Sequence, residues 1–430
     1  MEIYVVQPND TIYSIAAKYN VSPKKLIQDN QLDYPNRLVT GQTIVIVYPK
    51  QTYIVKPGDS LESIARENNV SFMQLLRNNP FLSNTTIKPG DVLTISYNTS
   101  GTMDTNGYIY PYVDRNIYKK TLPSLTYITI YNYRTTGEGG IISYYDDTEV
   151  VQLAREYGTI PLFMATTLSA QGEPDTEAVY SLLLNETYFN NFVNNSIELM
   201  KQKGYLGLNI VFNYMNQGSL QLYLDVVVKL NEKLAQNNFL LFLTINPDTR
   251  YVDDQVVFER IDYSVFEDKI TNITFLPLIW GTNYGPPLPI NSFKCLSTFV
   301  EYVTSIMSAD KIIVGNTLIS YDWPLPYVPG VTYANSLSIN SSLRLAMEEG
   351  STIQFDEISQ SPYFNYTNNS TEHIVWTVDA RSIQALVDVI REYKLEGAGF
   401  WNLMIYAAQL WLVINSQFDV NKFIPNIFDS

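Results

Sequence analysis

The chain has 430 residues, with 43 acidic side chains against 28 basic ones and a formal net charge of −15. This length exceeds that of one ordinary domain and allows a large hydrophobic core. The acidic balance argues against nucleic acid or anionic lipid as a partner. The single cysteine, Cys295, excludes an internal disulfide and is predicted to be buried. The single histidine, His373, excludes a histidine-rich metal site and is predicted to lie in a solvent-side loop. No metal and no cofactor are expected.

The sequence opens with Met1-Glu2-Ile3-Tyr4, a strand-like start without the basic region and apolar run of a signal peptide. No apolar run reaches the ~20 residues that a membrane-spanning helix needs. We therefore expect synthesis in the cytoplasm and no membrane partner.

The first hundred residues contain an internal repeat with a constant offset of 49 residues, from Tyr4 to Tyr53. Each copy opens with Tyr-x-Val-x-Pro-x-Asp, at 4–10 and 53–59. Alternation predicts a strand there, and the helical period through Ile12 and Ala16 predicts a helix after it. A second helix and a return strand complete a βααβ unit in each copy. The return strands are expected at 43–47 and 92–96.

This repeat resembles a tandem pair of LysM domains, at 2–48 and 52–97. The resemblance implies binding of peptidoglycan, chitin or another glycan that contains N-acetylglucosamine. The groove would lie between the first strand–helix turn and the loop before the last strand. The same turns also cap helices, so a purely structural role is the alternative for each side chain. The implied groove residues are Asn9, Asp10, Thr11, Ile12, Asn30, Gln31 and Leu32 in the first copy, and Gly58, Asp59, Ser60, Leu61, Asn79, Pro80 and Phe81 in the second.

Residues 98–106 have the polar, small-residue composition of a linker. From 107 to 430, apolar strand-like runs alternate with helical patterns such as 194–203 and 220–236. This alternation predicts an α/β fold, a (β/α)8 TIM barrel preceded by the two small α+β LysM domains. An extra hairpin is expected at 352–378. The strand cores are expected at 107–110, 127–133, 160–166, 206–212, 239–245, 273–278, 312–318 and 397–401.

The fourth of these strands carries the frame Gly204-Tyr205-x-Gly207-x-Asn209-Ile210-x-Phe212. It resembles the signature strand of glycoside hydrolase family 18, which reads Asp-x-x-Asp-x-Asp-x-Glu, or Asn-Ile-Asp-Phe-Glu in the spore-type branch. In that family the glutamate protonates the glycosidic oxygen, while the substrate's own acetamido oxygen attacks the anomeric carbon and the aspartate orients it. A tyrosine on another strand hydrogen-bonds the acetamide. Here Val211 stands at the aspartate, Asn213 at the glutamate and Leu278 at the tyrosine.

These three replacements predict a barrel without catalytic residues. An asparagine amide supplies no proton near neutral pH, so the roughly 10²–10⁴-fold contribution of general acid catalysis is lost. Acids elsewhere are the alternative source of a proton, although Asp322 and Asp356 are expected to hold loops after the seventh strand. The candidate acids are Asp322, Asp356, Glu357, Glu138, Asp146 and Asp147.

Aromatic side chains near the strand ends could still bind a sugar by stacking on its apolar faces. Trp401 matches the family tryptophan that forms the floor of the sugar site, whereas Trp323 is expected to pack in the core. Asn213 is a possible neutral amide contact. The predicted glycan-binding residues of the barrel are Asn213, Trp280, Trp401, Tyr133 and Tyr321.

Nearly the whole chain resembles spore-cortex N-acetylglucosaminidases, which carry two LysM domains before a family 18 barrel. The matching segments outside the fourth strand are 107–111, 122–127, 284–287, 321–330, 354–357 and 379–384. The resemblance implies synthesis in the mother cell and deposition on the spore coat, cortex or exosporium.

Three functions stay open at this stage. The first is a catalytically degenerate, glycan-binding component of the spore envelope, and the second is an active N-acetylglucosaminidase that uses an unrecognised acid. The third is a self-assembling coat or exosporium element, with itself or other coat proteins as partners. The 33 tyrosines suit lateral contacts, although an AT-rich genome would also raise their number.

Overall fold

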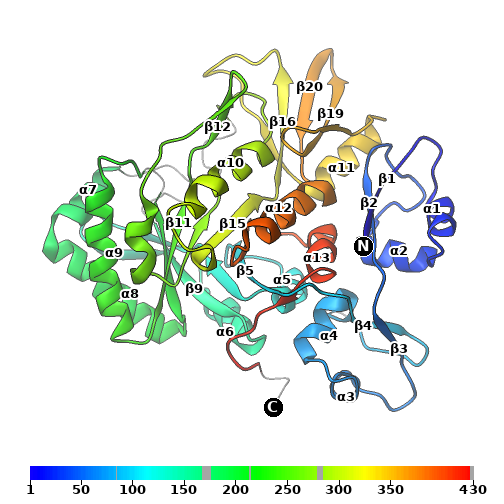
Figure 1. Ribbon diagram of the computed structural model, residues 1–430, viewed down its shortest axis with the longest axis horizontal. Helices are drawn as coiled ribbons and strands as arrows, with labels where there is room; N and C mark the ends of the chain where they lie inside the picture. Colours follow the sequence, from blue (N-terminus) through cyan, green and yellow to red (C-terminus); the bar gives the residue numbers. More distant parts are fainter. Residues whose placement is uncertain (84, 167–175, 213–214, 278–283, 427–430) are drawn as a thin grey trace.

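The computed structural model describes residues 1–83, 85–166, 176–212, 215–277 and 284–426 (Figure 1). Two small N-terminal domains, blue in Figure 1, lie along one flank of a large barrel. Among the helices in these ranges, none has the length and apolarity needed to cross a bilayer.

Both N-terminal domains have the predicted βααβ order. The first helix of each begins with a capping box, in which the Thr11 and Ser60 side chains accept the N–H groups of Ser14 and Ser63. The apolar faces of the helices close a separate small core in each domain. The first domain contains β1 (Glu2–Val5), α1 (Ile12–Lys18), α2 (Pro23–Asn30) and β2 (Thr43–Ile46), and the second contains β3 (Gln51–Ile54), α3 (Leu61–Glu67), α4 (Phe72–Asn78) and β4 (Val92–Ser96).

The remainder of the chain forms the predicted barrel. In the described residues, eight parallel strands close into a ring because the last strand pairs with the first. Long apolar runs form these strands, since both of their faces are buried. The strands are β5 (Thr102–Ile109), β6 (Tyr127–Ile130), β9 (Ile160–Ala165), β10 (Gly207–Phe212), β11 (Leu240–Ile245), β14 (Asn272–Phe275), β15 (Ile312–Thr317) and β21 (Gly397–Trp401).

The linker prediction was wrong for residues 102–106, which form the first part of β5. Their polar side chains read as a linker in the sequence, but Asp104, Thr105 and Asn106 are buried and hydrogen-bonded inside the structure. A short strand, β22 (Asp419–Val420), pairs with the start of β5.

A ring of helices surrounds the barrel. Helix α8 shows why these segments are helical: apolar residues recur on one face, and Gly204 ends the helix in a left-handed conformation at φ +86°. Cys295 is buried on α10, as predicted. The ring comprises α5 (Arg115–Thr121), α6 (Thr148–Glu156), α7 (Thr176–Leu184), α8 (Glu186–Lys203), α9 (Leu220–Ala235), α10 (Phe293–Thr304), α12 (Ala380–Tyr393) and α13 (Ala408–Asn415).

A second sheet is inserted between β15 and α12. It has five antiparallel strands in the order β17-β16-β20-β19-β18, so the predicted hairpin at 352–378 is part of a larger element. The sheet consists of β16 (Ile319–Leu325), β17 (Asn335–Ser338), β18 (Gln354–Asp356), β19 (Ser361–Asn368) and β20 (Thr371–Trp376), with α11 (Ile339–Glu348) beside it. Two short hairpins lie elsewhere in the chain. One pairs β7 (Tyr133–Thr135) with β8 (Ile141–Ser143), and the other pairs β12 (Arg250–Val252) with β13 (Gln255–Val257).

His373 lies on β20, so its predicted loop position was wrong. Its Nδ1 atom is 2.8 Å from Oδ1 of Asp322, and its ring stacks on Tyr366 with 4.7 Å between centroids. The Tyr366 hydroxyl donates to Oδ2 of Asp322 at 2.8 Å. The strand pairing of β20 with β16 and β19 brings these three side chains together.

The barrel holds the first LysM domain through hydrogen bonds from α13. The Gln409 side chain donates to the Thr43 carbonyl at 2.6 Å and to Oδ1 of Asn30 at 3.2 Å. Gly41 lies so close to the barrel that a Cβ atom there would meet the Ile353 carbonyl oxygen at 1.9 Å. The second domain is held by Arg77, whose buried guanidinium pairs with Asp419 at 2.9 Å.

We expect Gly41→Ala to loosen the first LysM domain. Gly90 occupies the same position in the second repeat, with φ +93° against +88° at Gly41, but no atom lies within 4 Å of its Cβ position. Gly90→Ala should therefore cost about 1 kcal/mol of backbone strain only, whereas Gly41→Ala should cost several kcal/mol more. Thermal unfolding with limited proteolysis between the domains measures this, and equal losses in the two variants would refute the docking.

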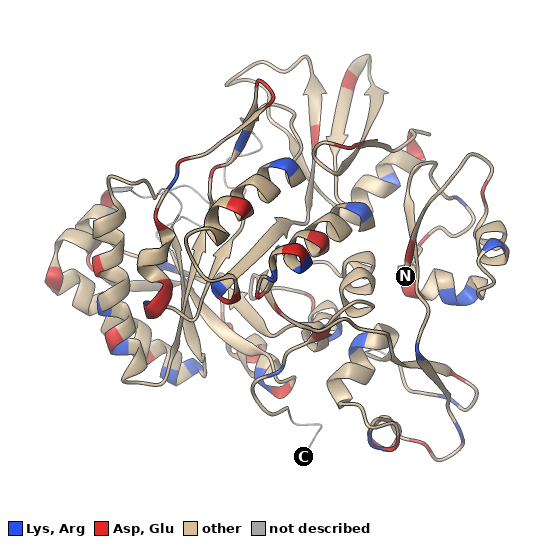
Figure 2. Cartoon of the chain, in the orientation of Figure 1, with Lys and Arg blue, Asp and Glu red and all other residues tan. Residues whose placement is uncertain are grey.

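The barrel strands carry almost no charged residues, which lie mainly on the surrounding helices and loops (Figure 2). Within the eight strands as bounded above, Asp104 is the one charged residue. Burial raises the pKa of Asp104, and burial together with the Asp104 carboxyl raises the pKa of nearby Glu396 to about 7 from 4.5.

Glu396→Gln should stabilise the protein at alkaline pH. Because the folded state raises the pKa of Glu396, its contribution to stability is full below pH ~4.5 and is lost as the pH rises to about 7. Glutamine does not ionise, so the free energy of unfolding of the variant at pH 8 should exceed that of the wild type by about 1–2 kcal/mol. This figure allows for the partial exposure of the side chain. Urea unfolding at pH 5 and pH 8 measures the difference in stability between the variant and the wild type. A variant that is more stable than the wild type at pH 5 but not at pH 8 would contradict the raised pKa of Glu396.

Candidate functional site

The interior of the barrel contains a buried polar layer. The Asn209 amide donates to Oγ1 of Thr129 at 3.1 Å and accepts from Oγ1 of Thr244 at 2.9 Å. The Tyr108 hydroxyl lies 2.7 Å from Oγ1 of Thr244, and burial raises its pKa. These bonds join β5, β6, β10 and β11 through neutral groups, and they fix the inward face of β10.

An apolar layer lies above this one, toward the carboxyl ends of the strands. Val211 is two residues beyond Asn209 on β10 and points inward on the same face. It is 7% exposed and belongs to a cluster with Met164, Leu276 and Trp401. Its position on β10 agrees with the predicted register of the fourth strand. Val211 therefore packs in a cluster of aliphatic, sulfur-containing and aromatic side chains.

Three predicted site residues lie outside the described ranges. These are Asn213, Leu278 and Trp280. Their identities are known from the sequence, and their positions in the site stay predictions.

Trp401 is the last residue of β21 and lies in the apolar layer, and its role as the floor of a sugar site stays a prediction. It is 3% exposed and contacts Tyr110 and Tyr131, with ring centroids 6.0 and 6.4 Å away. Tyr110 stacks on Tyr112 at 5.3 Å, and Tyr112 meets Tyr145 at 5.2 Å. A continuous series of rings thus leads from the buried Trp401 to the surface.

The outer rings of this series were missed in the sequence analysis. Tyr112 is 57% exposed and Tyr145 is 52% exposed, so both offer open faces for stacking on a sugar. The alternation of Tyr108 and Tyr110 was a signal for the inner rings only, because Tyr112 lies in the turn that follows β5. Tyr145 comes from a separate loop and carried no such signal.

A stacking role for Tyr133 is contradicted by its position. Tyr133 is 1% exposed and packs in the main core between barrel and helices. Its hydroxyl donates to Oδ2 of Asp147 at 2.5 Å, as does that of Tyr205, while Nζ of Lys203 lies 3.2 Å from Oδ1. Burial raises the pKa of both tyrosines. Their protonated hydroxyls therefore serve to hold a buried carboxylate.

Tyr321 is also covered by other residues, and its ring lies 5.5 Å from that of Trp323. The packing role predicted for Trp323 is confirmed. Trp323 is fully buried, and its Nε1 donates to the Gly285 carbonyl at 3.1 Å.

Most of the alternative acids have partners of their own. Asp322 binds His373 and Tyr366 as described above. Asp356 accepts from Ile358 and Ser359, which confirms its predicted role in holding a loop. Asp146 accepts from Thr148 and Lys203, and these bonds lower its pKa. Glu138 and Glu357 are exposed. Within the described residues, no group of three or more His, Cys, Asp or Glu side chains is placed to hold a metal ion.

In the LysM domains, several predicted groove residues hold the fold. Asn30 bridges to the return strand, donating to the Val45 carbonyl and accepting its N–H, both at 2.8 Å. Asn79 makes the equivalent pair of bonds with Thr94. Ile12 is buried in the core of the first domain. The Asp10 and Asp59 carboxylates accept hydrogen bonds from the hydroxyls of Tyr4 and Tyr53. Thr11 and Ser60 cap the first helix of each domain.

The remaining groove residues are more accessible. Asn9 and Gly58 adopt equivalent left-handed conformations, at φ +70° and +93°, as expected for asparagine in place of glycine. The half-buried members are Gln31, Leu32, Leu61, Pro80 and Phe81. Gln31 and Leu32 line a cavity shared with the barrel, and Leu61 and Pro80 line a second, smaller one.

Comparison with known proteins places this geometry in a family. The LysM domain model matches residues 4–47 and 53–96, and the model for glycosyl hydrolases family 18 matches residues 105–404. A cortical fragment-lytic enzyme of Bacillus subtilis (strain 168) is 32% identical over 429 residues, covering 98% of this chain and 99% of its own.

Two solved structures are similar over the full length. The spore cortex-lytic enzyme SleL of Bacillus megaterium QM B1551 has a TM-score of 0.79 at 28% identity, covering 98% of this chain and 99% of its own. The SleL of Bacillus cereus has a TM-score of 0.80 at 25% identity, covering 99% of each chain. The chain therefore belongs to glycosyl hydrolase family 18 and carries two LysM domains before its barrel.

Proposed function

We propose that this protein binds peptidoglycan or a related N-acetylglucosamine-containing glycan of the spore envelope without hydrolysing it. The observation that carries the proposal is the burial of Val211 in an apolar layer with Met164, Leu276 and Trp401. A valine neither orients an acetamide nor polarises it. Asn213 at the acid position and Leu278 at the tyrosine position add two further losses in the sequence.

The apolar surroundings of Val211 distinguish this chain from an enzyme with one recent substitution. A carboxylate needs hydrogen-bond donors or cations around it when it is buried. Met164 and Leu276, which share the cluster with Val211, provide neither.

Features suited to glycan binding remain. The rings from Trp401 through Tyr110 to Tyr112 and Tyr145 form a path from the barrel mouth outward. The relatives named as cortical fragment-lytic and spore cortex-lytic enzymes support spore peptidoglycan as the ligand. They also support a location on the spore, in the cortex, coat or exosporium.

Calorimetric titration with N-acetylglucosamine oligomers tests the binding. Because a sugar stacked on an exposed ring gains about 0.5–1.5 kcal/mol, Tyr112→Ala and Tyr145→Ala should each weaken binding about 2–10-fold. Tyr180, equally exposed at 57% but on α7, provides the control, and Tyr180→Ala should bind normally. Failure of the wild-type protein to bind any oligomer would refute the proposal.

Hydrolysis is the second candidate, and the names of the relatives favour it. It requires an acid other than the residue at position 213. Asp322, Asp356 and Asp146 are engaged by the contacts given above, and Asp147 is enclosed by Tyr133 and Tyr205. Product analysis in the same titration samples separates the two candidates.

A further inference from the structure

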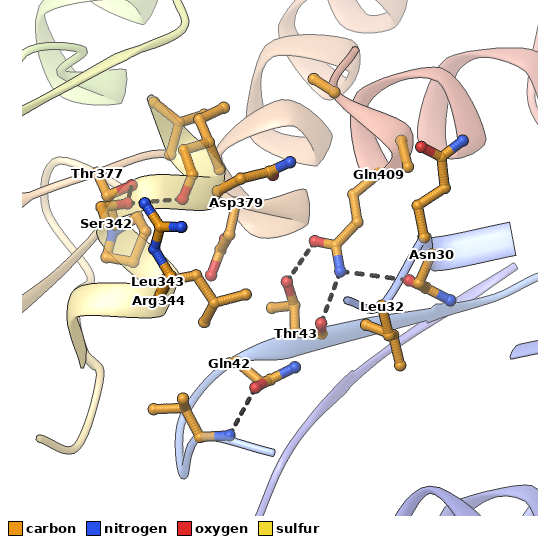
Figure 3. A pocket seen from close by; sticks show the side chains of 18 of the residues that line it. Asn30, Leu32, Gln42, Thr43, Ser342, Leu343, Arg344, Thr377, Asp379 and Gln409 are labelled. Carbon is orange, nitrogen blue, oxygen red and sulfur yellow. Dashed lines mark hydrogen bonds between the residues drawn. The ribbon is translucent and has the colours of Figure 1, made fainter. Parts of the chain in front are cut away.

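A cavity of about 210 Å³ lies between the first LysM domain and the barrel (Figure 3). One wall is the loop between α2 and β2, including Gln31 and Leu32, and the opposite wall is α11, including Leu343 and Arg344. One water takes about 30 Å³ of liquid volume, so the cavity has room for about seven waters, which is the order of size of a single sugar residue.

The charges around the cavity point to an anionic ligand group. Arg344 and Arg37 both line it and are exposed, and neither guanidinium forms an ion pair or hydrogen bond with another described residue. Asp379 also lines it, but its carboxylate is taken by Arg381, with Nη2 to Oδ2 at 2.6 Å. Asp33 lies at the exposed side.

The rest of the lining suits a sugar. Leu32, Leu343 and Met347 offer apolar surface for the faces of a pyranose ring. The Gln409 amide is already used in the bonds to Thr43 and Asn30 that hold the domains together. The cavity is therefore held open by fixed contacts at one side, and its cationic groups remain available at the other.

We propose that this interdomain cavity binds a glycan residue that carries a carboxylate, such as the lactyl ether of N-acetylmuramic acid. Arg344 and Arg37 contact the carboxylate, and the LysM loop and α11 enclose the ring from both sides. The inference rests on the proposed glycan binding and adds the choice of an acidic sugar over a neutral one. Recognition thus requires both domains in their docked arrangement.

Calorimetry on the full-length chain tests this with three probes. They are the disaccharide of N-acetylglucosamine and N-acetylmuramic acid, the methyl ester of the same disaccharide, and neutral di-N-acetylchitobiose. A charge-assisted contact contributes about 1.5 kcal/mol or more, so the free acid should bind about tenfold more tightly than its ester. Arg344→Gln should remove this preference. The control is Arg250→Gln, which removes a remote, exposed guanidinium and should retain the preference.

Hydrogen exchange gives a second readout. Binding of the acidic disaccharide should protect 30–43 and 339–347 together. Equal affinity for acid and ester, or an unchanged preference in Arg344→Gln, would overturn this inference while leaving neutral glycan binding intact. Protection of 30–43 without 339–347 would also overturn it, because the site would then belong to the LysM domain alone. Absence of binding by all three probes would overturn both proposals.

Discussion

Replacing Val211 by aspartate should lower the free energy of unfolding by about 3 kcal/mol at pH 8. Val211 is buried in a cluster with Met164 and Leu276, and a carboxylate there would lose its hydration without gaining a donor from either of these two side chains. Its folded-state pKa would rise, so the protonated form would be favoured and the loss should be smaller at pH 5 than at pH 8. Urea unfolding at both pH values measures this.

Val211→Ala provides the matched control. It removes two methyl groups and introduces no charge, so its loss of about 2 kcal/mol should not depend on pH. If Val211→Asp were as stable as the wild type at pH 8, the site would still accommodate the family carboxylate. The claim that the surroundings of Val211 no longer suit an acid would then be wrong.

Replacing Asp147 by alanine should cost about 3–5 kcal/mol, the usual result of removing one partner from a buried ionic cluster. Two tyrosine hydroxyls, of Tyr133 and Tyr205, would lose their acceptor, and Lys203 would lose a buried partner. Asp147→Asn should cost less, because an amide oxygen still accepts a hydrogen bond. Thermal and urea unfolding measure the series.

The neighbouring Asp146 tests whether burial of the carboxylate causes the large loss of stability expected at Asp147. Its side chain is 79% exposed, although it also pairs with Lys203 at 2.9 Å. Asp146→Asn should therefore change stability by less than about 1 kcal/mol. Comparable losses at the two positions would contradict the assignment of Asp147 as a structural acid.

Much of the fold could be predicted from sequence because its signals are local. The repeat offset and the capping residues gave both βααβ units, and apolar runs gave the eight barrel strands. The errors came where tertiary contacts override local composition. Residues 102–106 look like a linker, yet their polar groups find partners inside the barrel. His373 was assigned to a loop because its partners, Asp322 and Tyr366, come from other strands.

The site was predicted less completely, for a related reason. The placement of Val211 on a barrel strand followed from the apolar run and the glycine and asparagine positions of that strand, and its alignment with the family aspartate stays a prediction. Tyr133 was chosen for its place near a strand end, which does not reveal that its hydroxyl turns to the buried Asp147. The path through Tyr112 and Tyr145 depends on two loops that meet only in the folded protein. The cavity at Arg344 depends on the docking of two domains, which no local pattern encodes.

Release of reducing ends from spore-cortex peptidoglycan fragments is the most direct test of binding without hydrolysis. The purified chain should bind the fragments and release no more reducing ends than a blank without protein. The cortical fragment-lytic enzyme of Bacillus subtilis serves as the positive control. Reducing ends that accumulate with the concentration of this protein, and that disappear when one of its acids is replaced, would contradict the account.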